Sequence, residues 1–364
     1  MPFRRKEGRA DRNRTSRVGG LLCLAVITFL LPGCGIGPTV LGRDRLDYQT
    51  ALSESWKQQI LQNLVRIRYA DAPVFLEVTS IISQYQVGAQ LNAGTSLNNP
   101  PWSHQEQFSG SAAYSDKPTL TYMPMTGEKF ARSLFMPISP ATIVSLVQAG
   151  WPVDMTLRLT CASVNGIRNR AQGPAMARAG DPEFEELLAA FRRIQLDGTI
   201  ATRIEKKGVV ETAFVIISQE TSKQSQVDEA RVRELLGLDP NAKELRLVYG
   251  VVASGKTELA MQTRSMSQLL LELAGCIDVP AEHVASGKTY PNPKEKDALA
   301  FIRIHSGVIK PSEAFAEVQY RGHWFWIDDG DFASKRMLTL MMMFFSLVEP
   351  GGGAGAPIVT VNAG

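Results

Sequence analysis

The chain has 364 residues, 44% of them apolar, and a formal net charge of +3. This length allows a sizeable core and exceeds one average domain, so we expect one large domain or two closely packed ones. The excess positive charge lies in the first 20 residues: without their seven basic and two acidic side chains, 32 basic and 34 acidic residues remain, a net charge of −2. Because the remaining chain has no run of Lys or Arg, we expect no nucleic-acid partner.

The N-terminal segment has the pattern of a secretory signal. Basic residues up to Arg17 precede the uncharged apolar run 21–31, which is too short to cross a bilayer. The sequence Leu31-Pro32-Gly33-Cys34 follows. These residues resemble the lipobox of bacterial lipoproteins, in which a Leu stands three positions before the Cys and a small residue directly before it. The alternative is an uncleaved anchor in which Cys34 is an ordinary apolar residue.

The lipobox resemblance implies a division of the chain and a location. Residues 1–33 would be the signal peptide, 34–44 a tether and 45–364 the mature region, with a possible division near residue 180. Lipid on Cys34 would hold the protein in the cell envelope. Since Gly35 rather than Asp follows this Cys, we expect the outer membrane, facing the periplasm, rather than the inner membrane.

Two cysteines remain in the mature region. Cys161 and Cys276 belong to no metal-binding motif, and the envelope permits disulfides. We expect two buried free thiols, with a disulfide between them as the alternative.

The mature region begins with a helix followed by strands. Apolar residues recur every four positions from Leu52 to Leu64, which predicts a helix over about 46–69 that ends before Pro73. Residues 74–82 are mostly apolar on both faces, which predicts a buried strand.

An amphipathic hairpin is predicted over residues 84–114. Apolar and polar residues alternate over 84–91 and again over 107–114, separated by a loop rich in Asn, Pro and Ser at 92–103. Each arm has nearly the length and alternation of a transmembrane strand, which raises the hypothesis of an oligomeric outer-membrane pore or export component. A hairpin with one face in water has the same pattern and is the alternative.

The middle of the chain mixes helices and strands. Ser139 is a predicted N-cap, with Pro140 at the first helical position. Other helices are expected over 129–135, 182–194 and 227–236, and strands over 119–122, 154–164, 199–206, 209–218 and 244–252. This order predicts an α+β fold with mixed or antiparallel sheets and several packed helices.

Residues 250–257 match the phosphate-binding motif G-x-x-x-x-G-K-[ST]. Gly250, Gly255, Lys256 and Thr257 are therefore nucleotide-binding candidates, with Asp328 as a magnesium ligand. A P-loop must open a helix, however, whereas the residues after Thr257 alternate like a strand, and Ser265 is the better N-cap for a helix ending near residue 274. The hexapeptide Val-Ala-Ser-Gly-Lys-Thr also recurs at 284–289 before two prolines. A hairpin turn is the favoured interpretation.

The last part of the chain has strands and one long helix. Strands are predicted over 300–305, 314–320 and 323–327, the last one central because it is apolar on both faces. Asp328, Asp329 and Asp331 are candidates for calcium or magnesium binding, but capping of a helix over 332–348 by Asp331 is favoured. This helix, with Met341-Met342-Met343, is expected to be buried, with a docking surface for a partner as the alternative.

Catalytic motifs are missing from the sequence. His104, His283, His305 and His323 show no metal-ligand spacing, and no motif of a catalytic Ser or Cys is found. We therefore expect no catalytic residues, no cofactor and no metal. The sequence predicts a lipid-anchored envelope protein with a structural or interaction role, with protein partners or copies of itself.

Overall fold

The computed structural model describes residues 38–82, 85–97, 104–116, 119–171, 178–198, 200–207, 210–217, 222–292 and 301–348. The predicted signal peptide with Cys34 lies outside the described residues. The chain divides into two compact units, 1–56 and 57–364. A further division near residue 180 stays a prediction. Within the described residues, no helix combines the length and the apolar character needed to cross a membrane.

Helix α2, Pro38–Arg68, is longer than predicted. It begins at Pro38 rather than near residue 46, so residues 38–44 of the predicted tether are helical. Leu46 is exposed, whereas Ile60, Leu61, Leu64 and Val65 are fully buried. The last two turns of α2 therefore contribute to the core.

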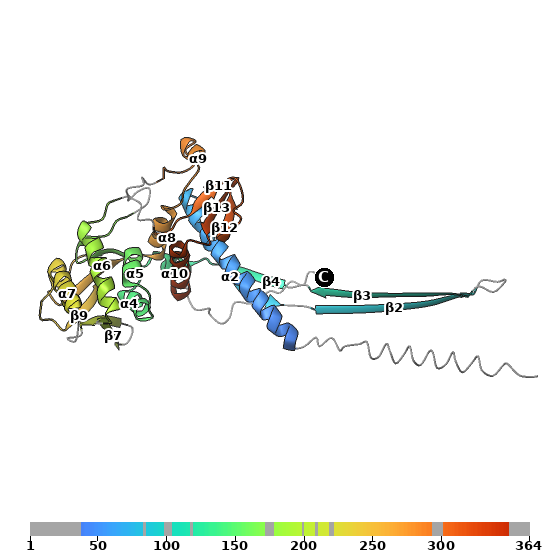
Figure 1. Ribbon diagram of the computed structural model, residues 1–364, viewed down its shortest axis with the longest axis horizontal. Helices are drawn as coiled ribbons and strands as arrows, with labels where there is room; N and C mark the ends of the chain where they lie inside the picture. The colour runs from blue at the N-terminus through green and yellow to red at the C-terminus, as the bar shows by residue number, and fades with distance from the viewer. Residues whose placement is uncertain are drawn as a thin grey trace, which may run out of the picture. The chain divides into compact units, whose positions relative to one another are not determined.

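Two separate two-stranded sheets follow α2. β1, Leu76–Ile82, pairs antiparallel with β4, Thr119–Pro124. β2, Tyr85–Leu97, and β3, His104–Asp116, form the predicted hairpin, which is drawn as two long strands side by side in Figure 1. The predicted loop over 92–103 is wrong in its first half, because residues 92–97 continue β2 and pair with β3. The expectation of a buried strand over 74–82 is wrong: β1 has β4 as its only partner strand among the described residues, and Leu76 is exposed.

The largest sheet has six strands and is mixed. Its order is β6, β5, β10, β9, β8, β7. All neighbours are antiparallel except β9 and β10, which are parallel. The strands are β5, Cys161–Val164; β6, Ile167–Arg168; β7, Ile200–Lys207; β8, Val210–Ile217; β9, Glu244–Tyr249; and β10, Glu258–Thr263.

Helices pack on this sheet and on each other. The N-cap Ser139 accepts a hydrogen bond from the amide of Thr142, as predicted, and Ser265 forms a full capping box with Gln268. The helices are α3, Glu128–Phe135; α4, Pro140–Gln148; α5, Val153–Thr160; α6, Pro182–Leu196; α7, Lys223–Leu236; and α8, Met266–Ala274.

The predicted strand over 154–164 is wrong, because its first part is helix α5. The buried residues Val153, Thr156, Leu157 and Thr160 have the i, i+3, i+4, i+7 spacing of a helix. The alternation of Met155, Leu157 and Leu159 suggested a strand, but it covers only five positions. Only the last four residues, β5, are extended.

A three-stranded antiparallel sheet and two helices complete the described fold. The strand order is β11, His305–Gly307; β13, His323–Asp328; and β12, Ala314–Tyr320, so the predicted central position of β13 is confirmed. The predicted strand 300–305 is wrong, because β11 begins only at His305. α9, Ala281–Ala285, is a short helix that the sequence did not predict, and α10, Phe332–Val348, is a core helix with Leu338 and Met341 fully buried. The α+β fold class is confirmed.

Candidate functional sites

The β2–β3 hairpin has a register that aligns the two predicted apolar series. Val87 is opposite Tyr114, Ala89 opposite Ala112, and Leu91 opposite Gly110. Residues directly opposite each other in an antiparallel pair share one face of the sheet. The apolar positions of both strands therefore lie on one side of the hairpin, and the intervening positions, including Gln90 opposite Ser111, lie on the other.

The hairpin also lacks charge over most of its length and pairs with no other strand. β2 has no acidic or basic residue, and the nine residues 107–115 of β3 have none between Glu106 and Asp116. Among the described strands, β2 and β3 pair only with each other. Within the described part of the chain, their outer edges therefore have backbone groups without a partner strand.

The motif at 250–257 does not have the geometry of a P-loop. It joins β9 to β10, and strand β10 begins at Glu258 where a P-loop would open a helix. The Ser254 amide donates a hydrogen bond to the Glu258 carboxylate at 2.9 Å, so an anion of the protein itself occupies that donor. Asp328 is on β13, in a different sheet.

The predicted hairpin turn at 250–257 is wrong as well, because β9 and β10 are parallel. Arg246 is opposite Glu258 and Tyr249 opposite Met261, so the eight residues of the connection return the chain to the start of β9. Parallel neighbours usually need a longer crossover, so an eight-residue connection between them is unusual. Lys256 is exposed on this connection.

The three aspartates before α10 have separate partners. Asp331 accepts hydrogen bonds from the amide and hydroxyl of Ser334, which confirms it as the N-cap of α10. Asp329 pairs with Lys335 at 2.7 Å. Asp328 accepts a hydrogen bond from the indole of Trp326 and lies 3.2 Å from Nε2 of His305. Their oxygens are thus engaged with protein groups rather than directed at one common point.

A cluster of Glu282, His283 and His323 is a candidate metal centre that the sequence did not predict. One ligand atom from each of these residues lies within 4.8 Å of the other two. Nε2 of His323 is 3.4 Å from Oε1 of Glu282, and Nε2 of His283 is 4.0 Å from the same oxygen. Both imidazoles are buried, with ring centroids 4.8 Å apart, whereas the carboxylate of Glu282 is exposed.

Tyr69 holds the ring of His283 from the side opposite Glu282. Its hydroxyl is 2.7 Å from Nδ1 of His283. Burial raises the pKa of Tyr69 to about 12, so the phenol is protonated at neutral pH. Burial, followed by the positive charge of Lys288, lowers the pKa of His283 below its ordinary 6.5, which favours the neutral ring.

The histidine cluster could not be found from sequence spacing. His283 lies on α9 and His323 is the first residue of β13, 40 positions later. Glu282 and His283 are adjacent, which is not the spacing of ligands on one helix face. Only the fold brings His323 to this pair.

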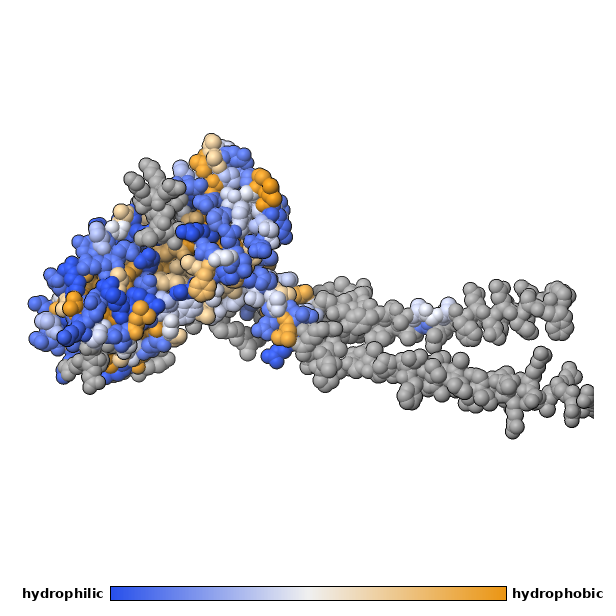
Figure 2. Space-filling view, viewed as in Figure 1, coloured by the Kyte–Doolittle hydropathy of each residue, from blue (hydrophilic) through white to orange (hydrophobic). Residues whose placement is uncertain are grey.

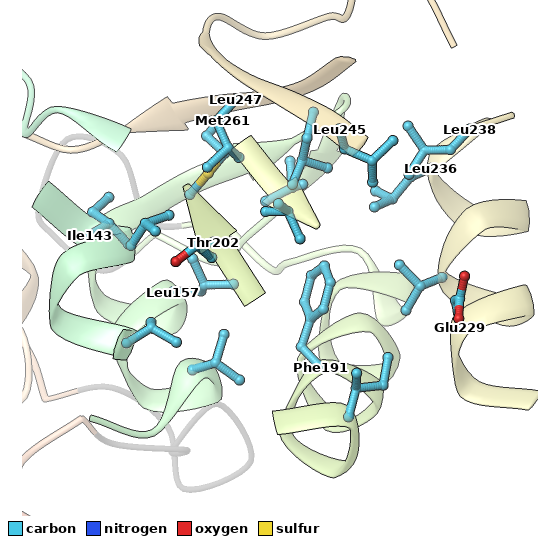
Figure 3. A pocket seen from close by; sticks show the side chains of 18 of the residues that line it. Ile143, Leu157, Phe191, Thr202, Glu229, Leu236, Leu238, Leu245, Leu247 and Met261 are labelled. Atoms are coloured by element: carbon cyan, nitrogen blue, oxygen red, sulfur yellow. The ribbon is translucent and has the colours of Figure 1, made fainter. Parts of the chain in front are cut away.

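An apolar cavity lies between the six-stranded sheet and helices α4 to α7. Figure 3 shows Leu157 and Phe191 from the helices on one side, and Leu245 and Leu247 from the strands on the other. Its volume is about 80 Å³ and its exposed wall is apolar. Because no polar group is presented to this space, the cavity offers no means of orienting a polar ligand. On the face drawn in Figure 2, exposed hydrophobic residues form small separate groups in a mostly hydrophilic described surface.

Cys161 and Cys276 are buried thiols that form no disulfide with each other, as expected. Burial raises the pKa of both thiols, to about 12 for Cys161 and about 11 for Cys276. Both are therefore protonated and unreactive at neutral pH.

Comparison with known protein families, curated proteins and solved structures gave no match for this chain.

Proposed function

We propose that the protein is a lipid-anchored component of the cell envelope with a structural or interaction role, and that the β2–β3 hairpin is its contact element. Lipid on Cys34 would hold it at the outer membrane, facing the periplasm. The lipobox resemblance supports the anchor, and the unpaired edges of the hairpin support the interaction.

The observation that carries this proposal is that β2 and β3 pair only with each other among the described strands. A two-stranded hairpin is at best marginally stable in water, and its open edges are templates for further strands. The partner we propose is the hairpin of a second copy of this chain, because strands that are uncharged over most of their length can add edge to edge with little charge repulsion. Repetition of this pairing around a ring would leave no strand unpaired.

The length of the two strands and the polarity of the two faces of the hairpin favour insertion of this ring into the outer membrane, as an oligomeric pore or export component. Thirteen residues of β-strand extend about 44 Å, or roughly 30 Å along the membrane normal at a tilt near 45°. The apolar row of Val87, Ala89 and Leu91 would face lipid, and Gln86, Gln90 and the serines of β3 would face water.

Matched substitutions on the two faces test this proposal. Leu91→Asp places a charge in the lipid-facing row. A basic residue near the bilayer midplane costs about 2–4 kcal/mol of insertion free energy, and Asp costs somewhat less. Gln90→Asp adds the same charge at the neighbouring position on the water-facing side. We expect wild type and Gln90→Asp to form a defined oligomer in detergent extracts, and Leu91→Asp to remain monomeric.

Monomeric wild-type protein, or equal behaviour of the two variants, would contradict self-association through the hairpin. The anchor is tested separately with Cys34→Ser, which is expected to move the protein from the membrane fraction to the periplasm. Unchanged membrane attachment of this variant would contradict lipidation at Cys34.

A further inference from the structure

We propose that Glu282, His283 and His323 bind one divalent transition-metal ion, and that zinc is the ion this site fits best. This inference is independent of the hairpin and of the lipid anchor. It rests on the geometry of the cluster and on its supporting hydrogen bond.

Two of the three ligand–ligand distances are close to those of a zinc site, and the third, between the two imidazoles, lies within 4.8 Å. Ligand atoms about 2.0–2.2 Å from a tetrahedral zinc ion lie roughly 3.3–3.5 Å from each other. The separation of 3.4 Å between His323 Nε2 and Glu282 Oε1 already has this value. The separation of 4.0 Å between His283 Nε2 and the same oxygen is slightly larger, and the exposed carboxylate of Glu282 can move to shorten it.

Tyr69 gives His283 the support that a metal ligand requires. A ligating imidazole usually donates its other N–H to a fixed acceptor, which sets the tautomer and the ring orientation. The hydroxyl of Tyr69, 2.7 Å from Nδ1, is in this position. If Nδ1 carries the proton, the lone pair of Nε2 is directed toward the metal.

His323 is a buried polar side chain without sufficient protein partners. Its Nδ1 is buried and has no hydrogen-bond partner in the described part of the chain. Its Nε2 lies 3.4 Å from the carboxylate of Glu282, whose side chain is 71% exposed. Buried polar groups in native proteins are nearly always satisfied, so a further partner at this ring is expected. A metal ion shared with Glu282 and His283 would bind Nε2 of this ring. Nδ1, on the other side of the ring, would carry the proton and would not contact the ion.

The donor set selects the kind of metal. Two imidazoles and one carboxylate suit zinc and other first-row ions, whereas calcium and magnesium prefer oxygen ligands only. Three protein ligands leave a fourth position for water or for a group from a partner. Because His283 is on α9 and His323 on β13, the ion would also join α9 to the three-stranded sheet.

The test is zinc titration of the untagged mature chain in detergent, after chelation of bound metals and dialysis. Calorimetry is expected to give one zinc ion per chain, and cobalt is expected to give the visible spectrum of a four-coordinate site. Glu282→Gln and Tyr69→Phe should each weaken binding about 10–100-fold, as loss of a weak ligand or of a supporting group does. His323→Gln should abolish the stoichiometric binding.

His305→Gln is the matched control, because His305 also lies in the three-stranded sheet beside carboxylates but outside the cluster. Its zinc affinity should equal that of wild type. Glu282→Gln changes an exposed side chain and is expected to fold, so its affinity is interpretable even if a histidine variant unfolds. Absence of stoichiometric zinc binding in wild type, or wild-type affinity in Glu282→Gln, would overturn the proposal.

Discussion

The hydroxyl of Tyr69 and Nδ1 of His283 form a buried hydrogen bond of 2.7 Å between residues 214 positions apart in the sequence. Tyr69 directly follows α2, and its ring also packs against Tyr320 and Phe325 of the three-stranded sheet, at centroid distances of 5.5 and 6.1 Å. A single side chain therefore connects the end of α2, helix α9 and this sheet. The guanidinium of Arg321 also lies over the ring of Tyr69, 5.3 Å from its centroid.

Tyr69→Phe is expected to lower the free energy of unfolding by about 1–3 kcal/mol. The substitution keeps the ring contacts but leaves Nδ1 of His283 buried without its partner, and an unsatisfied buried group has a cost of this size. Urea unfolding of the chelated protein measures the change without any contribution from metal. Tyr122→Phe, at an exposed position, is the control and should have no effect. An unchanged unfolding midpoint in Tyr69→Phe would show that water replaces the hydroxyl.

The Arg193–Asp228 pair should make stability depend on pH below about pH 4. Both oxygens of Asp228 accept hydrogen bonds from the guanidinium, at 2.7 and 2.8 Å, and join α6 to α7. These bonds lower the pKa of Asp228 below its ordinary 3.8. A lowered carboxyl pKa contributes stability that is fully present above the ordinary pKa and is lost as the pH falls through the folded-state pKa.

Asp228→Asn is therefore expected to cost about 1 kcal/mol at pH 7, because Arg193 is half exposed and solvent weakens the pair. The difference from wild type should disappear as the pH falls well below 4. Denaturant unfolding at several pH values measures both effects. Glu186→Gln is the control: Glu186 and Arg231 also join α6 to α7, but both side chains are exposed, so a smaller loss is expected. Equal losses in the two variants would contradict a role for the burial of Asp228.

Local signals in the sequence predicted the helices whose N-termini are capped by residues close in the sequence. Ser139 and Ser265 cap their helices through short-range hydrogen bonds, and Asp331 does the same for α10. The hairpin was found because its alternation continues through both arms. These features depend on neighbours within a few positions, and such neighbours are visible in a sequence.

Other elements depend on contacts that the sequence does not display. The alternating pattern in α5 covers too few residues to distinguish a strand from a helix. In the fold, the ion pair between Arg158 of α5 and Glu185 of α6, at 2.6 Å, supports the helix. The parallel pairing of β9 with β10 requires an unusually short crossover. The proposed metal ligands His283 and His323 meet only because α9 lies beside the start of β13. Each of these outcomes is set by the tertiary fold.

Lys256→Ala tests the nucleotide-binding motif directly. We expect wild type to show no change in melting temperature with low-micromolar ATP and magnesium, because residue 258 begins a strand and Glu258 occupies the Ser254 amide. Lys256 is exposed, so the variant should unfold at the same temperature as wild type. Stabilisation of wild type by the nucleotide that is lost in Lys256→Ala would restore the P-loop interpretation.

Substitutions at two methionines of α10 distinguish a helix that only forms the core from one that also binds a partner. Met341 is fully buried, whereas Met343 is 41% exposed. Met341→Ala is expected to lower the free energy of unfolding by about 2–5 kcal/mol, since it removes a buried side chain and leaves a cavity. Met343→Ala should change it by about 0.5 kcal/mol or less, because the site is partly in water and Ala favours the helix. Chemical denaturation of both variants measures the contrast, and a loss at Met343 as large as that at Met341 would indicate that this side of α10 is covered by another protein surface.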